Sequence, residues 1–134
     1  KPTLVFPVQS REILMPQGDA IWSETLAQYQ THAGVDILSD AGEAVLAALP
    51  GTVADTGIDP LLGFYVHLSH EDGVSTRYAC LQARDRPEAG KSVAAGDVIG
   101  YVGNPGLSEC VLPPHLHFEA YADGVWSDLF PGLS

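Results

Sequence analysis

Basic residues are scarce in this chain of 134 residues, and their scarcity excludes several classes of function. Only 6 lysines and arginines stand against 17 aspartates and glutamates, which gives a formal net charge of -11. A surface of this sign repels nucleic-acid phosphates and is not attracted to anionic membranes. The sequence has no apolar run of membrane-spanning length and no signal-peptide pattern at its start. We therefore expect no nucleic-acid partner, and membrane contact only through an N-terminal anchor that these residues do not include.

Cysteine is rare as well, since Cys80 and Cys110 are the only two. Two cysteines permit one disulfide and are too few to indicate the redox compartment. The sequence shows no repeat and no low-complexity linker, and its length suits one domain with a hydrophobic core. Glycine (14) and proline (10) are frequent, so we expect many turns.

Alternating patterns and turn signals predict antiparallel strands over most of the chain. The clearest hairpin covers residues 64–70 and 74–81, which alternate apolar and polar side chains around an Asp-Gly turn. Another hairpin runs from residues 115–121 through a second Asp-Gly turn into residues 125–126.

The remaining predicted elements are short. We expect strands at 4–8, 44–49 and 52–55, a strand pair within 93–102, and a short helix at 23–30 that Ser23 caps. No helical pattern separates the strands, which argues against a parallel α/β sheet. The sequence therefore predicts an all-β fold, an antiparallel β-sandwich or open barrel with at most one or two short helices.

Two histidines stand two residues apart at the start of the predicted strand 115–121. Since residues i and i+2 of a strand point to the same face, His115 and His117 should project side by side. Leu116 and Phe118 should then point into the core. Paired imidazoles on one face suit a metal ion or a proton transfer.

A second pair of candidate ligands lies upstream, at His32 and Asp36. Catalytic zinc sites typically take three protein ligands and leave the fourth position to water. His32, Asp36 and one of the two later histidines would supply such a set. Taken alone, His32 would be interpreted as a solvated loop histidine, because Gly34 and two β-branched residues disfavour a helix that would align it with Asp36.

Four short motifs follow one another along the chain. They are His32-x-Gly34-x-Asp36-Ile37, Thr76-x-Tyr78-x-Cys80-Leu81, Gly96-Asp97-x-Ile99-Gly100 and His115-Leu116-His117-Phe118-Glu119. In this order they resemble the motifs of the LytM/lysostaphin-type zinc metallopeptidases. The resemblance implies the LytM (duplicated hybrid motif) fold in a single domain over residues 1–134, with a core at about 32–122 and a lead-in segment at 1–31.

The resemblance also implies a site and a substrate. It implies one zinc ion held by His32, Asp36 and His117, with His115 as a catalytic residue that handles protons or stabilises the tetrahedral intermediate. The substrates it implies are peptides of the bacterial cell wall (peptidoglycan). From this follows an expected extracytoplasmic location in the cell envelope.

Cys80 departs from the pattern, because active members of this family carry a second catalytic histidine at its position. The unperturbed pKa of a thiol is well above that of imidazole, so a thiol is a poor proton carrier near neutral pH. Loss of one general acid or base typically costs about 10²- to 10⁴-fold in rate. We therefore expect impaired catalysis with the zinc site retained.

The approach to the His-x-His strand is a second departure. Residues 108–114 form a longer loop than is usual in the family, and the loop carries Cys110. We expect it to border the groove, so that Cys80 and Cys110 can form a disulfide beside the site; two unlinked thiols are the alternative. Neither His67 nor His70 is assigned to the metal, since His70 is expected to stabilise a turn through a hydrogen bond and His67 to be exposed.

A second functional hypothesis comes from residues 22–32, which resemble the lead-in of the stage II sporulation protein Q-like branch of the family. Members of that branch are membrane-anchored scaffolds that bind a partner protein and often lack the histidine that Cys80 replaces. The alternative to a peptidase is therefore a non-catalytic zinc-binding sporulation scaffold. A lipoyl- or biotin-type carrier, suggested by residues 96–100, is set aside because neither Lys1 nor Lys91 lies on an Asp-Gly hairpin.

Overall fold

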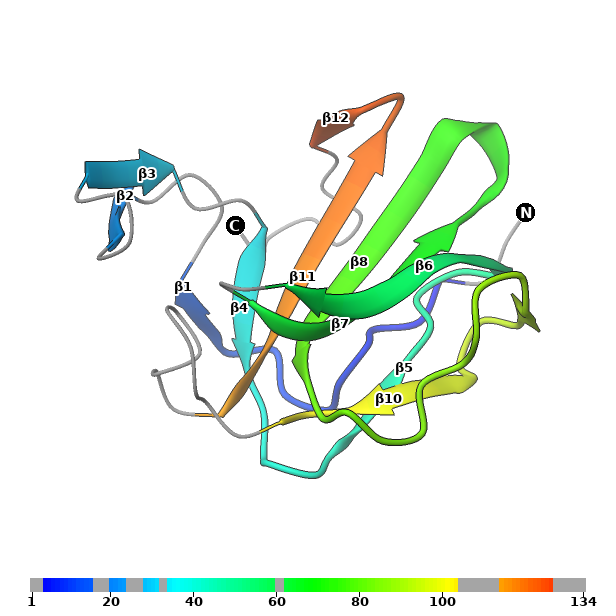
Figure 1. Cartoon of the computed structure of the whole chain (residues 1–134), viewed down its shortest axis with the longest axis horizontal. Coiled ribbons are helices and arrows are strands. Elements are labelled where there is room, and N and C mark those ends of the chain that lie inside the picture. The colour runs from blue at the N-terminus through cyan, green and yellow to red at the C-terminus, as the bar shows by residue number, and fades with distance from the viewer. Residues whose placement is uncertain are drawn as a thin grey trace.

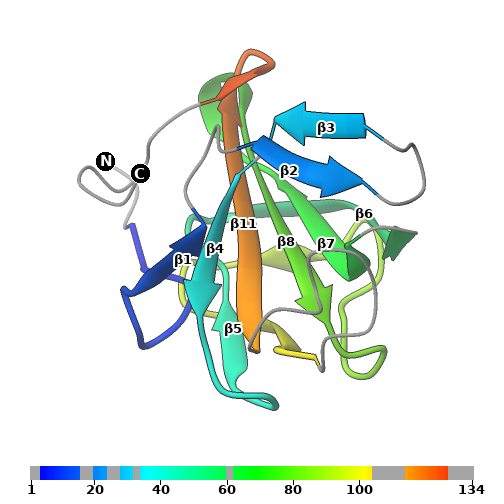
Figure 2. The same cartoon turned by 90° about the vertical axis from the view of Figure 1, so that its left-hand side faces the viewer.

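One large antiparallel sheet dominates the computed structural model, which describes residues 4–15, 20–23, 28–31, 34–59, 62–103 and 114–126. Its strands are β1 (Ile13–Met15), β4 (Val35–Leu38), β6 (Gly51–Asp59), β7 (Gly63–Ser69), β8 (Val74–Leu81), β9 (Ser92–Val93), β11 (His115–Ala122) and β12 (Val125–Trp126). They pair in the order β1-β4-β11-β8-β7-β6-β9, and β12 is added to β11. Figure 2 shows β4, β11, β8 and β7 side by side in this order.

Two smaller antiparallel sheets accompany the large one (Figure 1). One pairs β5 (Ala44–Leu46) with β10 (Val98–Tyr101), and the other pairs β2 (Ala20–Ser23) with β3 (Gln28–Thr31). The β5–β10 pair packs against one face of the large sheet, because Val45 and Ile99 share a buried cluster with Leu68, Leu116 and Phe118. The core thus lies between two layers, and the predicted all-β antiparallel sandwich is confirmed.

The predicted hairpins at 64–81 and 115–126 are also confirmed. β7 and β8 are joined by the 3-10 turn η1 (Glu71–Gly73), in which Asp72 and Gly73 both have positive φ. The second hairpin turns at Asp123 and Gly124, which have positive φ as well. In the described part of the chain η1 is the only helical element.

Three predicted elements are wrong. Ser23 ends β2 and residues 28–30 lie in β3, so the helix expected at 23–30 is replaced by strand pairing, which overrides the local cap signal. The two strands within 93–102 do not pair with each other, because β9 adds to β6 and β10 to β5. Residues 4–8 form no strand, although the Val5 amide donates to Ala48 and the Pro7 carbonyl accepts from Leu46.

Candidate functional site

The register between β4 and β11 brings Asp36 and His117 directly opposite each other. Residues that oppose each other in an antiparallel pair share a face, so the carboxylate and the imidazole project together. His115 projects on the same side, two residues away. Leu116 and Phe118 alternate with the histidines and belong to the buried core, as the sequence predicts.

Both His115 and His117 lie close to the carboxylate of Asp36. Its Oδ1 atom lies 2.8 Å from Nδ1 of His117 and 3.7 Å from Nε2 of His115. All three side chains are at most 1% exposed. One buried carboxylate oxygen therefore faces two imidazole nitrogens that come from a strand about 80 residues later in the sequence.

A second carboxylate, that of Glu119, contacts the other nitrogen of the His117 ring. Glu119 Oε2 lies 2.8 Å from Nε2 of His117, and Glu119 Oε1 accepts a 2.6 Å hydrogen bond from the hydroxyl of Tyr121. Burial alone would raise the pKa of Glu119, but these hydrogen bonds and the charges of His117 and Arg77 lower it below the usual value. Burial and the bond to Glu119 raise the pKa of Tyr121. The carboxylate is therefore ionised and the phenol is neutral near neutral pH.

Gly34 makes room for this contact. A Cβ atom added there would lie 2.5 Å from the Phe118 carbonyl oxygen, 2.6 Å from Cγ of Glu119 and 3.2 Å from Nε2 of His117. Its φ of +86° is also one that residues with side chains rarely adopt. The glycine between His32 and Asp36 is thus required by close approach of the backbone to β11.

Cys80 lies beside His115 at the end of β8. Its Sγ is 3.6 Å from Nε2 of His115, its side chain is buried, and its φ is +63°. Cys80 is disulfide-bonded, as the bridge hypothesis expects, and the only other cysteine of the chain, Cys110, lies outside the described residues. A disulfide sulfur carries no proton, so at this position it can accept a weak hydrogen bond but cannot donate one.

The donor set of this cluster fits zinc. An aspartate oxygen and an imidazole nitrogen are ordinary zinc ligands, and two tetrahedral ligands of one zinc ion lie about 3.3 Å apart. The Asp36 Oδ1 to His117 Nδ1 distance of 2.8 Å is within about half an ångström of that separation. Glu119 lies at the other nitrogen of His117, the place where a carboxylate commonly supports a histidine that binds a metal. The third predicted ligand, His32, lies outside the described residues, and within those residues no group of three side chains could hold a metal.

The other two described histidines lie apart from the cluster. Nδ1 of His70 donates to the Pro50 carbonyl at 2.8 Å and its Nε2 lies 2.7 Å from Oγ1 of Thr76, so the predicted turn-stabilising bond is present. His67, expected to be exposed, is half-buried between Asp55 and Arg77 in the strand register.

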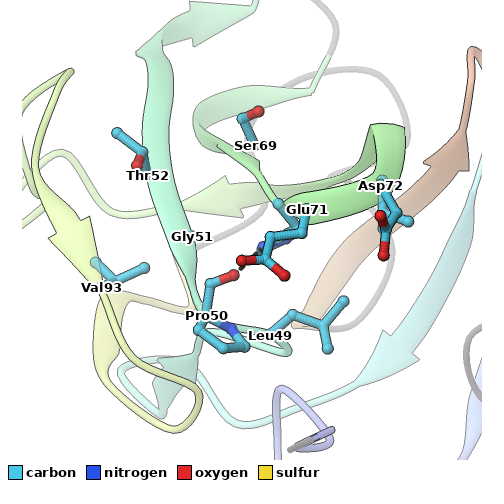
Figure 3. Close-up of a pocket in the computed structure, with 10 residues that line it drawn as sticks. Leu49, Pro50, Gly51, Thr52, Ser69, Glu71, Asp72 and Val93 are labelled. Carbon is cyan, nitrogen blue, oxygen red and sulfur yellow. Dashed lines mark hydrogen bonds between the residues drawn. The ribbon is translucent and has the colours of Figure 1, made fainter. Parts of the chain in front are cut away.

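His70 also lines a pocket of about 720 Å³ at the other end of β8 (Figure 3). The pocket is bordered by Pro50, Glu71, Asp72 and Val74, whereas the cluster lies near Cys80. Cys80 lies six residue positions after Val74 on the same extended strand, which corresponds to about 20 Å. This pocket and the His/Asp cluster are therefore separate features of the fold.

Sequence reasoning missed three residues of the cluster. The motifs include Glu119 and Gly34 but assign neither of them a role at the site, and Tyr121 is predicted only as the last residue of a strand. The period-two spacing of His117, Glu119 and Tyr121 is the signal that places all three on one face.

Comparison with known proteins identifies the family to which this chain belongs. The family model "Peptidase family M23" matches residues 30–129, and the chain therefore belongs to this family. It is 36% identical over 99 residues to the DD-carboxypeptidase/endopeptidase Mpg of Neisseria meningitidis, which covers 74% of this chain and 22% of that protein. It is 38% identical over 99 residues to the stage II sporulation protein Q of Bacillus subtilis, which covers 72% of this chain and 34% of that protein. The chain thus spans about a third or less of the length of these curated relatives.

Solved structures agree on the fold. The catalytic domain of lysostaphin from Staphylococcus simulans superposes with a TM-score of 0.72 at 26% identity, covering 91% of each chain. A chain of the SpoIIIAH and SpoIIQ complex superposes with a TM-score of 0.78 at 27% identity, covering 93% of this chain and 96% of that one. The resemblance to LytM/lysostaphin-type proteins, including the sporulation branch, is confirmed. Within the described residues no helix is long and apolar enough to cross a membrane.

Proposed function

We propose that this chain is a zinc-binding M23 endopeptidase domain that acts on peptidoglycan peptides with impaired catalysis. The observation that supports this most strongly is the convergence of His117 Nδ1 and His115 Nε2 on one oxygen of Asp36, at 2.8 and 3.7 Å. In this proposal residues 1–134 form one domain, with His32, Asp36 and His117 as the ligands of one zinc ion. When bound, zinc would polarise the scissile carbonyl and acidify a water molecule.

The roles of the two described histidines differ in this proposal. His117 is fixed between Asp36 and Glu119, with hydrogen-bond partners for both ring nitrogens. His115 lies farther from Asp36 and beside Cys80, which suits a group that takes and returns a proton. Both rings are buried, so water that would otherwise compete for these nitrogens is largely excluded.

Cys80 limits the rate in this proposal. Its sulfur is part of a disulfide, so it cannot act as the acid or base that a histidine would supply there. We expect the missing group to cost about 10²- to 10⁴-fold in rate, while the zinc ligands remain complete. A disulfide at this position also suits an oxidising, extracytoplasmic location.

A second candidate function is a non-catalytic zinc-binding scaffold that binds a partner protein. It is favoured by the similarity to stage II sporulation protein Q and to the SpoIIQ chain crystallised with SpoIIIAH. The oxidised Cys80 beside His115 supports it as well, since a scaffold does not need the missing proton carrier. Binding of purified SpoIIIAH, measured by calorimetry, would test this candidate directly.

The decisive experiment restores a histidine at position 80. Because that change also opens the disulfide, the variant Cys80→His with Cys110→Ser is compared with Cys110→Ser alone and with the native protein. Zinc content is measured by elemental analysis, and hydrolysis is followed on purified peptidoglycan and on an oligoglycine peptide. We expect one zinc per chain in all three proteins, and a rate about 10²- to 10⁴-fold higher only in the histidine variant.

Other results would change the conclusion. Absence of zinc from the native protein, or its retention after His32→Ala, would remove the proposed metal site. Equal rates in the native protein and the histidine variant would show that Cys80 does not limit catalysis. Zinc binding with no hydrolysis in any of the three would favour the scaffold.

A further inference from the structure

Glu119 and Tyr121 form an ordered chain of hydrogen bonds behind His117. Glu119 Oε2 lies 2.8 Å from His117 Nε2, and the Tyr121 hydroxyl donates to Glu119 Oε1 at 2.6 Å. Both carboxylate oxygens are therefore engaged, each by a different side chain of the same strand face. Glu119 is only 5% exposed, so water cannot readily replace either partner.

Each ring nitrogen of His117 faces a different carboxylate oxygen, Nε2 that of Glu119 and Nδ1 that of Asp36. Of the two carboxylates only Asp36 belongs to the proposed ligand set, so a metal bound between Asp36 and His117 would take the place of a proton on Nδ1, while Nε2 keeps its contact with Glu119. Which ring nitrogen can bind a metal is set by the hydrogen bond that the other nitrogen makes. The pair Glu119 and Tyr121 thus determines which atom of His117 is presented to the Asp36 side.

The backbone of Gly34 packs closely against the Glu119–His117 contact. A Cβ at Gly34 would fall 2.6 Å from Cγ of Glu119 and 3.2 Å from Nε2 of His117, so the glycine lies directly against their contact. The side chain of Glu119 therefore has little room to swing away from the ring. Restricted rotation of the carboxylate is what fixes the orientation of the imidazole.

We propose that Glu119, oriented by Tyr121 and enclosed by Gly34, is a positioning residue that keeps the proton on Nε2 of His117 and reserves Nδ1 for the metal. This inference rests on the proposed zinc-binding function. It extends that function by assigning residues outside the ligand set, and it requires no contact between Glu119 and substrate.

The test uses the whole chain in four variants. Glu119→Gln keeps the size of the side chain and removes its charge, and Tyr121→Phe removes only the hydroxyl that orients it. Tyr65→Phe is the matched control for the tyrosine, because Tyr65 donates an equally short 2.6 Å bond to Asp55 away from the cluster. Glu43→Gln is the matched control for the glutamate, since Glu43 accepts two exposed backbone hydrogen bonds.

Two readouts are measured on each protein. Zinc affinity is obtained by competition with a chromophoric chelator, and the Nε2–H proton of His117 is observed by ¹⁵N NMR in the metal-free protein. We expect zinc binding about 10- to 100-fold weaker in Glu119→Gln. In Tyr121→Phe we expect a loss of about 3- to 10-fold, because one hydrogen bond to the carboxylate is removed. The Nε2–H signal should exchange with solvent faster in both variants and be unchanged in the two controls.

The two readouts show whether a negative result contradicts the positioning role of Glu119 or the proposed zinc-binding function. If the native protein binds no zinc, the zinc function fails, and the NMR measurement still decides whether Glu119 holds the Nε2 proton. If the native protein binds zinc and Glu119→Gln binds it within about 3-fold of native, the positioning role is overturned. An unprotonated Nε2 in the native protein, or unchanged exchange in both variants, would overturn it as well.

Discussion

Asp36 on β4 and His117 on β11 lie directly opposite each other, with Oδ1 and Nδ1 2.8 Å apart in a buried contact. We predict that Asp36→Asn weakens zinc binding at least about 100-fold, because it would replace the proposed anionic ligand by a neutral side chain. The same change should destabilise the metal-free protein by about 2 kcal/mol, the scale of a hydrogen bond to a charged group. Calorimetric zinc titration and urea unfolding measure the two effects.

Asp55→Asn is the control for this substitution. Asp55 also accepts a short hydrogen bond from a described side chain, but it lies on β6, away from the histidines. Its zinc affinity should equal that of the native protein. An equal loss of affinity in both variants would mean that overall charge, rather than Asp36 itself, governs binding.

Gly34→Ala should be strongly destabilising. The added methyl would overlap the Phe118 carbonyl oxygen and Glu119, and the φ of +86° adds conformational strain. Together these effects should cost about 2–5 kcal/mol of unfolding free energy. Gly124→Ala isolates the strain, because Gly124 has a φ of +81° with nothing within 4 Å of the added atom. Similar losses in the two variants, measured by urea unfolding, would contradict the steric account.

The stability of the fold should fall as the pH is lowered below about 6.5. Burial lowers the pKa of His70, although its hydrogen bond to Pro50 opposes this, and burial and Arg77 lower that of His67. The unfolded chain then binds protons before the folded one, so both histidines contribute stability above pH 6.5 that is lost on acidification. The unfolding free energies of the native protein and of His70→Asn are measured between pH 7.5 and 5. The native protein should be more stable than the variant by the largest margin at pH 7.5, and the margin should shrink as the pH falls. An identical pH slope in the two proteins would count against this role of His70.

The disulfide at Cys80 should stabilise the fold as well as remove a proton carrier. With Cys110 as its partner it closes a loop of about 30 residues, and the chain-entropy estimate for such a loop is about 3–4 kcal/mol. Urea unfolding with and without a phosphine reductant should show a loss of this size in the native protein. Cys110→Ser should already be destabilised and should not respond to the reductant. A native protein equally stable in both conditions would show that the bridge adds nothing to stability.

The hairpins could be predicted from the sequence because their signals are local. Asp72-Gly73 and Asp123-Gly124 adopt the positive φ angles that such turns require, and the flanking residues alternate. The helix expected at 23–30 failed because a single capping serine was outweighed by pairing between β2 and β3. Local propensity is a weak guide where strand partners are available.

The site could be predicted only in part. The common face of His115 and His117 follows from the period of a strand, whereas the placement of Asp36 against them depends on the register of two strands distant in sequence. The motif resemblance supplied that pairing, and periodicity alone did not. The sequence does not decide whether Cys80 is oxidised, because a disulfide depends on a contact between distant segments.

The backbone conformation at position 80 decides which side chains could replace Cys80. Hydrogen bonds from the Cys80 amide to Leu62 and from the Gly103 amide to the Cys80 carbonyl hold the residue at a φ of +63° whatever its side chain. Among residues with side chains, asparagine, aspartate and histidine adopt this left-handed conformation most readily. The main chain at this position therefore already suits an imidazole, so that an exchange of cysteine for histidine would be compatible with the existing strand geometry.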